Sequence, residues 1–209
     1  MRPGLLLALL LAAAPAPEVR RLPPIDSCAA DPGFLAFRTE LQAAVERRDA
    51  AYLLSIVADD IEFSFGGEPG RDAFAREWQL DRPATSPLWP ELGEVLRLGC
   101  VADGDDGNWA PSLFMSEELD DPFGTALAIH PGAELHGAPG DASPVLATLD
   151  WDLVEVVEWN GEDPWQRVRT VDGREGYARS ADLRSPADYR AGFRRIAGRW
   201  RMTTFIAGD

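Results

Sequence analysis

The hydrophobic period of this chain changes once, near residue 100, and this change limits the folds open to it. Between Asp31 and Gly99, apolar residues recur at spacings of three and four, which is the period of amphipathic helices. Beyond residue 125, short apolar runs separated by turn residues indicate strands instead. We therefore expect an α+β protein, with a helical domain at residues 28–100 and strands after residue 125.

Capping residues set the expected bounds of the helices. Asp31-Pro32 and Asp49 each place a side-chain acceptor before an apolar stripe, which predicts two helix starts. Two further helices are expected over residues 71–80 and 86–99. The alternating segment Ile61–Phe65 predicts the one strand of this domain.

The second half divides into three expected parts. Residues 101–124 are interpreted as an acidic linker, and residues 125–185 as a domain of short strands. The pair Asp172-Gly173 predicts a two-residue type I′ hairpin turn. In residues 186–209 we expect a helix followed by a strand that packs back on the rest. The expected elements cover residues 126–135, 145–149, 153–159, 165–171, 174–179, 186–196 (the helix) and 199–206.

Charge is distributed very unevenly along the chain. All 20 basic residues are arginine, against 35 acidic residues, for a net charge of −15. Residues 101–166 hold 15 acids and no arginine, whereas residues 167–209 hold 10 arginines and 5 acids. The overall acidity argues against a nucleic-acid partner. We expect the arginines of the tail to pair with the acidic linker; a docking surface for an anionic partner is the alternative. These arginines are Arg184, Arg190, Arg194, Arg195, Arg199 and Arg201.

The N-terminus has the layout of a secretory signal peptide, expected over residues 1–16. Arg2 precedes an apolar run from Leu5 to Ala14, and small residues and prolines follow. A buried N-terminal helix is the alternative interpretation. The run is too short to span a bilayer, and no long apolar run follows, so we expect no membrane span. A periplasmic or secreted location follows from this interpretation.

An oxidising compartment would allow the two cysteines, Cys28 and Cys100, to form a disulfide. The closed loop would hold about 73 residues and contribute on the order of 4 kcal/mol in the chain-entropy description. Two free thiols are the alternative.

Five segments of residues 125–185 follow one another in a characteristic order: Pro131–His136, Ala142–Leu146, Trp165–Val168, Asp172–Ala178 and Asp182-Leu183. In this order they resemble a bacterial Src-homology-3-like domain. The resemblance implies a small, bent β-barrel that serves as a binding module of the cell envelope, for peptidoglycan or for a partner protein. His136 stands where the family usually has arginine, and Ala178 where it usually has valine.

The helical region weakly resembles ketosteroid-isomerase-like (SnoaL-like) proteins, through Phe34–Ala58, Ile61–Phe65, Gly70–Trp78 and the closing segment Trp200–Ile206. The long intervening strands of that family are missing. The resemblance implies that the last strand returns to pair with Ile61–Phe65, so that the strand domain is inserted between two parts of the helical region. Packing of the tail on the strand domain is the alternative.

The candidate binding residues are aromatic or imidazole side chains of the strand domain. Such rings can stack on sugars or peptides. Trp151 is the strongest candidate, because it lies in a turn between two acids; Trp159, His136 and Tyr177 complete the set. Tyr177 also fits a role in the core.

No set of residues converges on a catalytic or metal site. His130 and His136 could form a nucleophile pair with a cysteine, but a disulfide and two surface histidines explain the same residues. The run Asp103–Asn108 departs from a calcium loop at three positions. Asp60 is the best single acid for a SnoaL-like reaction, although a polar residue at a helix end is the preferred interpretation.

We therefore expect a non-catalytic binding or interaction module of the bacterial cell envelope, without cofactor or metal. Peptidoglycan or an envelope protein is the expected partner. A small-pocket enzyme or ligand binder in the helical part is the alternative.

Overall fold

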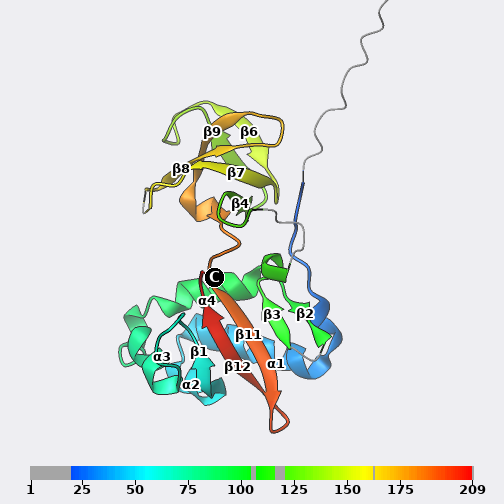
Figure 1. Cartoon of the computed structure of the whole chain (residues 1–209), viewed down its shortest axis with the longest axis vertical. Helices are drawn as coiled ribbons and strands as arrows, with labels where there is room; N and C mark the ends of the chain where they lie inside the picture. The colour runs from blue at the N-terminus through cyan, green and yellow to red at the C-terminus, as the bar shows by residue number, and fades with distance from the viewer. Residues whose placement is uncertain (1–19, 105–106, 116–120, 162, 209) are drawn as a thin grey trace, which may run out of the picture.

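The chain forms two lobes joined by several crossings of the chain, as the computed structural model shows (Figure 1). The model describes residues 20–104, 107–115, 121–161 and 163–208. The signal peptide expected at residues 1–16 lies outside these ranges. We call residues 27–110 with 190–206 the helical lobe, and residues 125–184 the sheet lobe. Their contents confirm the α+β class.

The helices of the helical lobe begin where the capping residues predict. Asp31 accepts hydrogen bonds from the backbone N–H groups of Gly33 and Phe34, and Asp49 accepts one from Tyr52. These bonds satisfy N–H groups that have no partner inside the helix. The helical elements are η1 (Ser27–Ala30), α1 (Pro32–Arg47), α2 (Ala50–Ile56), α3 (Arg71–Glu77), η2 (Pro83–Thr85) and α4 (Leu88–Arg97).

A five-stranded sheet with the order β1-β12-β11-β3-β2 lies against these helices. Its strands are β1 (Val57–Glu62), β2 (Val101–Ala102), β3 (Asn108–Ala110), β11 (Arg190–Ile196) and β12 (Arg199–Ile206). The pair β1 and β12 is parallel, so the last strand returns to the first as expected, but the first strand covers Val57–Glu62 and not Ile61–Phe65. Because β2 and β3 belong to this sheet, much of the segment expected as a linker is part of the helical lobe.

The helix expected over residues 186–196 is wrong, because residues 190–196 form strand β11. Arginine and alanine favour helices intrinsically, but β11 pairs with β12 on one side and β3 on the other, and tertiary pairing overrides local preference. The turn that follows, Ala197-Gly198, has positive φ at both residues, 49° and 79°, as a type I′ turn requires. Alanine rarely adopts this backbone conformation, so the local sequence does not predict the hairpin.

The seven-stranded sheet of the sheet lobe has the order β10-β4-β7-β8-β9-β5-β6. The expected strand at residues 126–135 is divided into β4 and β5 by a turn at Gly132, whose φ is +79°. Among the described residues, the end strands β10 and β6 do not pair, so no closed barrel is formed. The strands are β4 (Thr125–Ala128), β5 (Ala133–His136), β6 (Val145–Leu149), β7 (Leu153–Glu158), β8 (Trp165–Arg169), β9 (Glu175–Arg179) and β10 (Leu183–Arg184).

The β8–β9 hairpin turns at Asp172-Gly173 as expected, but the turn type differs. Gly173 has φ +84°, whereas Asp172 is not among the residues with positive φ, so the turn is not type I′. The N–H of Gly173 donates to the Thr170 carbonyl, and the N–H of Thr170 to the Arg174 carbonyl, which gives a three-residue loop. The longer loop lifts Val171 out of the sheet.

The lobes are held together by a small apolar cluster and by the N-terminal segment. Leu98 and Leu113 pack with Leu127 and Ile129 of the sheet lobe. Residues 20–26 follow both lobes: Leu22 N–H donates to the Trp151 carbonyl, and Cys100 N–H to the Ile25 carbonyl. The side chain of Arg184 also reaches Glu91 of α4 at 3.1 Å.

The expected disulfide between Cys28 and Cys100 is confirmed. It ties η1 to the residue that precedes β2, and both cysteines are buried. Its presence fits a location outside the cytoplasm. Within the described part of the chain, no helix has the length and apolarity needed to cross a bilayer.

Candidate functional site

His136 and Tyr177 lie side by side, because β5 and β9 pair at these two residues. His136 is not the surface residue expected from the sequence: it is only 3% exposed. Its ring packs edge-on against Trp165 with centroids 5.0 Å apart, its Nδ1 lies 3.1 Å from the Ser143 carbonyl oxygen, and its Nε2 lies 3.2 Å from Glu134. The His136 ring is therefore buried inside the sheet lobe, where it packs against Trp165 of β8.

The glycine next to Tyr177 explains how β9 approaches β5 so closely. A Cβ atom built on Gly176 would lie 2.6 Å from the carbonyl oxygen of His136 and 2.8 Å from a carbon of Leu135. Only glycine fits this position without a shift of the neighbouring strand.

Trp151 and Trp159 flank the two ends of β7, so the four candidate binding residues do not converge. Trp151 has φ +61° and packs against the apolar cluster between the lobes, which makes it half-buried rather than an exposed turn residue. Trp159 is 47% exposed and stands apart from the other three. A single aromatic platform for sugar stacking is therefore not assembled from this set.

A hollow of about 360 Å³ lies instead over β4, β7 and the β8–β9 hairpin. Its apolar lining comes from Leu153, Val154 and Val171, and its charged lining includes Glu155 and Arg169. The wall is completed by Asp121, Thr125, Thr170, Gly173 and, from the N-terminal segment, Arg20. This mixture of aliphatic surface and a few placed polar groups is typical of small ligand sites.

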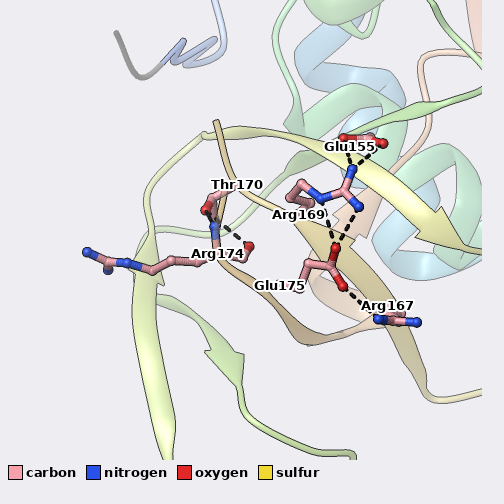
Figure 2. Close-up of polar contacts among 6 residues, drawn as sticks. All are labelled: Glu155, Arg167, Arg169, Thr170, Arg174 and Glu175. Atoms are coloured by element: carbon pink, nitrogen blue, oxygen red, sulfur yellow. Dashed lines mark hydrogen bonds and ion pairs between the residues drawn. The ribbon is translucent and has the colours of Figure 1, made fainter. Parts of the chain in front are cut away.

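A row of alternating charges crosses the sheet beside the hollow (Figure 2). Arg169 of β8 donates from Nη1 to both carboxylate oxygens of Glu155 on β7, at 2.7 and 2.6 Å. From Nε and Nη2 it donates to Glu175 on β9, at 3.0 and 2.6 Å. Arg167 donates to the second oxygen of Glu175 at 2.6 Å. We call Glu155, Arg167, Arg169 and Glu175 the charge ladder.

The ladder favours the charged states of Glu175 and Arg169. Hydrogen bonds from Arg169 and then Arg167 lower the pKa of Glu175 below its ordinary value. Hydrogen bonds to Glu175 and Glu155 raise the pKa of the Arg169 guanidinium. The Arg169 guanidinium already donates to two carboxylates, so it is not free to bind an anionic ligand group. It instead fixes the positions of Glu155 and Glu175 at the side of the hollow.

The hairpin loop forms a second wall, with a smaller hollow of about 140 Å³ on its other side. The N–H of Arg174 donates to the Thr170 hydroxyl at 3.2 Å (Figure 2), and Thr170 in turn hydrogen-bonds Asp172. Leu153, Thr170 and Val171 line both hollows. Val171 therefore stands between them as an exposed aliphatic ridge.

The sequence contains one signal for this site, but that signal does not predict the whole site. Arg167 and Arg169 lie two residues apart, and so share one face of a strand, which is the signal that places them opposite Glu155 and Glu175. The hollow itself depends on Arg20 and Asp121, which reach it from outside the sheet lobe. No local pattern predicts that approach.

Asp60, the acid expected in a SnoaL-like site, is exposed on β1. It lines an open hollow of about 650 Å³ together with Asp59, Arg71, Arg199 and Arg201. The interior between sheet and helices is packed with rings instead: Phe34 lies against Trp200, and Tyr189 stacks on Phe205 with centroids 5.0 Å apart. The acid and the lobe interior are therefore separate.

The described residues limit the possible chemistry. Both cysteines are in the disulfide, which removes the thiol needed for a thiol–imidazole nucleophile. Within the same residues, no cluster of three or more histidine, cysteine or carboxylate ligands could hold a metal ion. Comparison with models of known protein families gave no match, and no curated protein sequence matches the chain.

Proposed function

We propose that this protein is a non-catalytic binding module of the bacterial cell envelope, and that the hollow beside the charge ladder receives a short peptide. The observation that carries the proposal is the composition of the hollow: Leu153 and Val171 offer aliphatic surface, and fixed charges stand at its side. Aliphatic surface suits the methyl groups of peptide side chains. Sugar rings are more often bound on aromatic faces, and none lines this hollow.

The order of motifs in residues 125–185 supports the same proposal. Trp165 and Val168 are buried, Gly176 permits the contact of β9 with β5, and the short helical turn η5 (Ser180–Asp182) precedes β10. This arrangement agrees with the Src-homology-3-like interpretation of the sheet lobe. Domains of that type commonly serve as envelope binding modules, and peptidoglycan carries short peptide stems with methyl groups and charges.

The experiment is co-sedimentation of the disulfide-bonded protein with intact purified peptidoglycan, alone or with an excess of the soluble stem peptides that an amidase releases. We expect retention at low salt on the polymer alone and a large loss when the free stem peptides compete. Val171→Asp places a charge on the ridge between the two hollows and should abolish retention. Val145→Asp, at a similarly exposed valine on the edge strand β6, is the matched control and should bind as wild type does.

Two results would count against the proposal. One is the absence of wild-type retention on intact peptidoglycan, which removes the cell wall as the ligand. The other is equal retention of Val171→Asp and wild type, which removes the hollow as the site. Trp151→Ala tests the aromatic residue favoured from sequence; because Trp151 packs between the lobes, we expect it to lower stability more than binding.

The parallel pairing of β1 with β12 favours one further proposal, a SnoaL-like ligand binder in the helical lobe. The buried pocket that such a protein needs would have to open among the rings around Phe205. Binding of small apolar ligands to wild type, lost in Phe205→Trp but kept in Val171→Asp, separates this function from the first.

A further inference from the structure

The β11–β12 hairpin concentrates positive charge in a protein whose net charge is −15. Residues 194–201 read RRIAGRWR, which is four arginines in eight positions with no acid. Figure 1 shows the hairpin tip extending past the helices, at the end of the molecule away from the sheet lobe. Within this short stretch the sign of the surface is therefore opposite to that of the whole chain.

The apex of the hairpin is apolar and exposed. Ile196 is 45% exposed, and Ala197 and Gly198 complete a tip without a polar side chain. The register pairs Ile196 with Arg199, and Arg194 and Arg195 precede the tip. The hairpin thus has an apolar tip followed by a collar of guanidinium groups.

The base of the hairpin is rigidly packed in the helical lobe, so the tip extends into solvent and does not fold back on the lobe. Arg190 to Phe193 of β11 are buried, and Phe34 of α1 packs edge-on against Trp200 with centroids 4.9 Å apart. Arg195 lies over the Trp200 ring at 5.0 Å and reaches Asp31 at 3.0 Å. A tip held in this way loses little conformational entropy on binding.

Acidic groups near the hairpin do not cancel its charge. Asp31 is paired with Arg195, and Asp59 with Arg71 at 2.6 Å. The open hollow at the side of the hairpin is lined by Asp59 and Asp60 against Arg71, Arg199 and Arg201, which leaves an excess of one positive charge.

We propose that the β11–β12 hairpin docks on an anionic lipid bilayer surface, with Ile196 inserted at the headgroup boundary and the arginines on the lipid phosphates. Basic side chains behind an apolar tip are the combination that binds such an interface. A soluble acidic polymer or the acidic surface of another protein copy needs only the charges, and gives Ile196 nothing to insert into. This surface is separate from the peptide hollow of the sheet lobe.

The test is co-sedimentation of the disulfide-bonded protein with vesicles of phosphatidylcholine alone or mixed equally with phosphatidylglycerol. We expect binding to the anionic vesicles only, and weaker binding as salt rises. Arg199→Gln should weaken binding about fivefold, the usual effect of one arginine at an anionic leaflet. Ile196→Ser should weaken it by a similar factor through lost apolar contact.

Two control variants match these changes elsewhere on the surface. Leu146→Ser alters an exposed aliphatic residue on β6, and Arg82→Gln an exposed arginine of the helical lobe; both should bind as wild type does. Failure of wild type to sediment with anionic vesicles overturns the proposal. Loss of binding in Arg199→Gln with no change in Ile196→Ser also overturns it, because that pattern indicates recognition of charge alone.

Discussion

The two lobes are stabilised by different means. The core of the helical lobe contains six buried aromatic rings: Phe34, Phe74, Trp78, Trp89, Phe193 and Phe205. The central cluster of the sheet lobe has no aromatic ring, and four of its nine buried residues are alanine. Strand pairing must therefore carry a larger share of its stability. The lobe with the smaller core is also the lobe that carries the hollow proposed to bind a peptide.

This difference fits the roles we propose. A core of large rings fills space and leaves little room for a ligand, because protein interiors pack as densely as organic crystals. A thin sheet with small buried residues presents a long surface on which hollows can form. The peptide hollow and the lipid-docking hairpin accordingly lie outside both cores.

The largest expected difference in stability between the two lobes follows the removal of one large buried ring. Phe205→Ala should lower the free energy of unfolding of the helical lobe by about 3–5 kcal/mol, because Phe205 is fully buried and contacts three other rings. The matched change in the sheet lobe, Val168→Ala, should cost about 2 kcal/mol. Hydrogen exchange read by mass spectrometry reports each lobe separately; equal losses in both lobes for Phe205→Ala would mean that they unfold as one unit.

An acid-sensitive contact should distinguish the lobes at low pH. Arg38 donates to both oxygens of Asp26 at 2.6 and 2.5 Å, and this lowers the pKa of Asp26 below its ordinary value of 3.8. Because the folded pKa is depressed, the stabilisation is complete above pH 3.8 and is lost as the pH falls through the folded value. Asp26 is partly exposed, so solvent limits the effect to under about 1 kcal/mol.

Asp26→Asn should therefore flatten the loss of helical-lobe stability as the pH falls below 3.8, because the carboxyl with the depressed pKa is absent. Urea unfolding at a series of pH values measures it. Asp60→Asn, at an exposed carboxylate on β1, is the control and should follow wild type. A variant at Asp26 that loses stability with acid as steeply as wild type would contradict the expectation.

The smallest expected effect concerns the hairpin turn. Ala197 has φ +49°, a backbone that costs alanine more than asparagine or glycine. Ala197→Asn should raise the free energy of unfolding by about 0.5–1 kcal/mol, since Asn-Gly is the preferred type I′ pair. Thermal unfolding checks this. A lower melting temperature in the variant would show that the tip has another backbone conformation in solution.

Local signals predicted the helices and most strands of the sheet lobe, but not β2, β3 and β11, which complete the sheet of the helical lobe. Helix starts at Asp31 and Asp49 depend on neighbouring residues, and a disulfide between the only two cysteines depends on counting. Strand β11 could not be read locally, because its partners β3 and β12 define it and its turn uses an unfavourable alanine. The burial of His136 depends equally on Trp165, which approaches from another strand.

The pairing of charges was likewise determined by the fold and not by the local sequence. The expectation that tail arginines meet the acidic linker is not what the described ion pairs show for Arg184 and Arg195, whose partners Glu91 and Asp31 belong to the helical region. Acids of the Arg-free stretch do pair with later arginines, but within the sheet lobe, as in Glu155 with Arg169 and Asp141 with Arg179. The sign of each segment is readable from sequence, whereas the pairing follows from the topology.

The place of the last strand has a consequence for the order in which the protein can assemble. Strand β12 lies second in its sheet, between β1 and β11, with Met202 paired to Val57. A chain emerging from its N-terminus releases the whole sheet lobe, in which half of the strand pairings join neighbours in sequence, before β12 is available. The helical lobe must wait for the final residues to close over its aromatic core. The first lobe to be synthesised is thus the last to be completed, and a chain truncated before Arg199 would keep a folded sheet lobe attached to an open helical lobe.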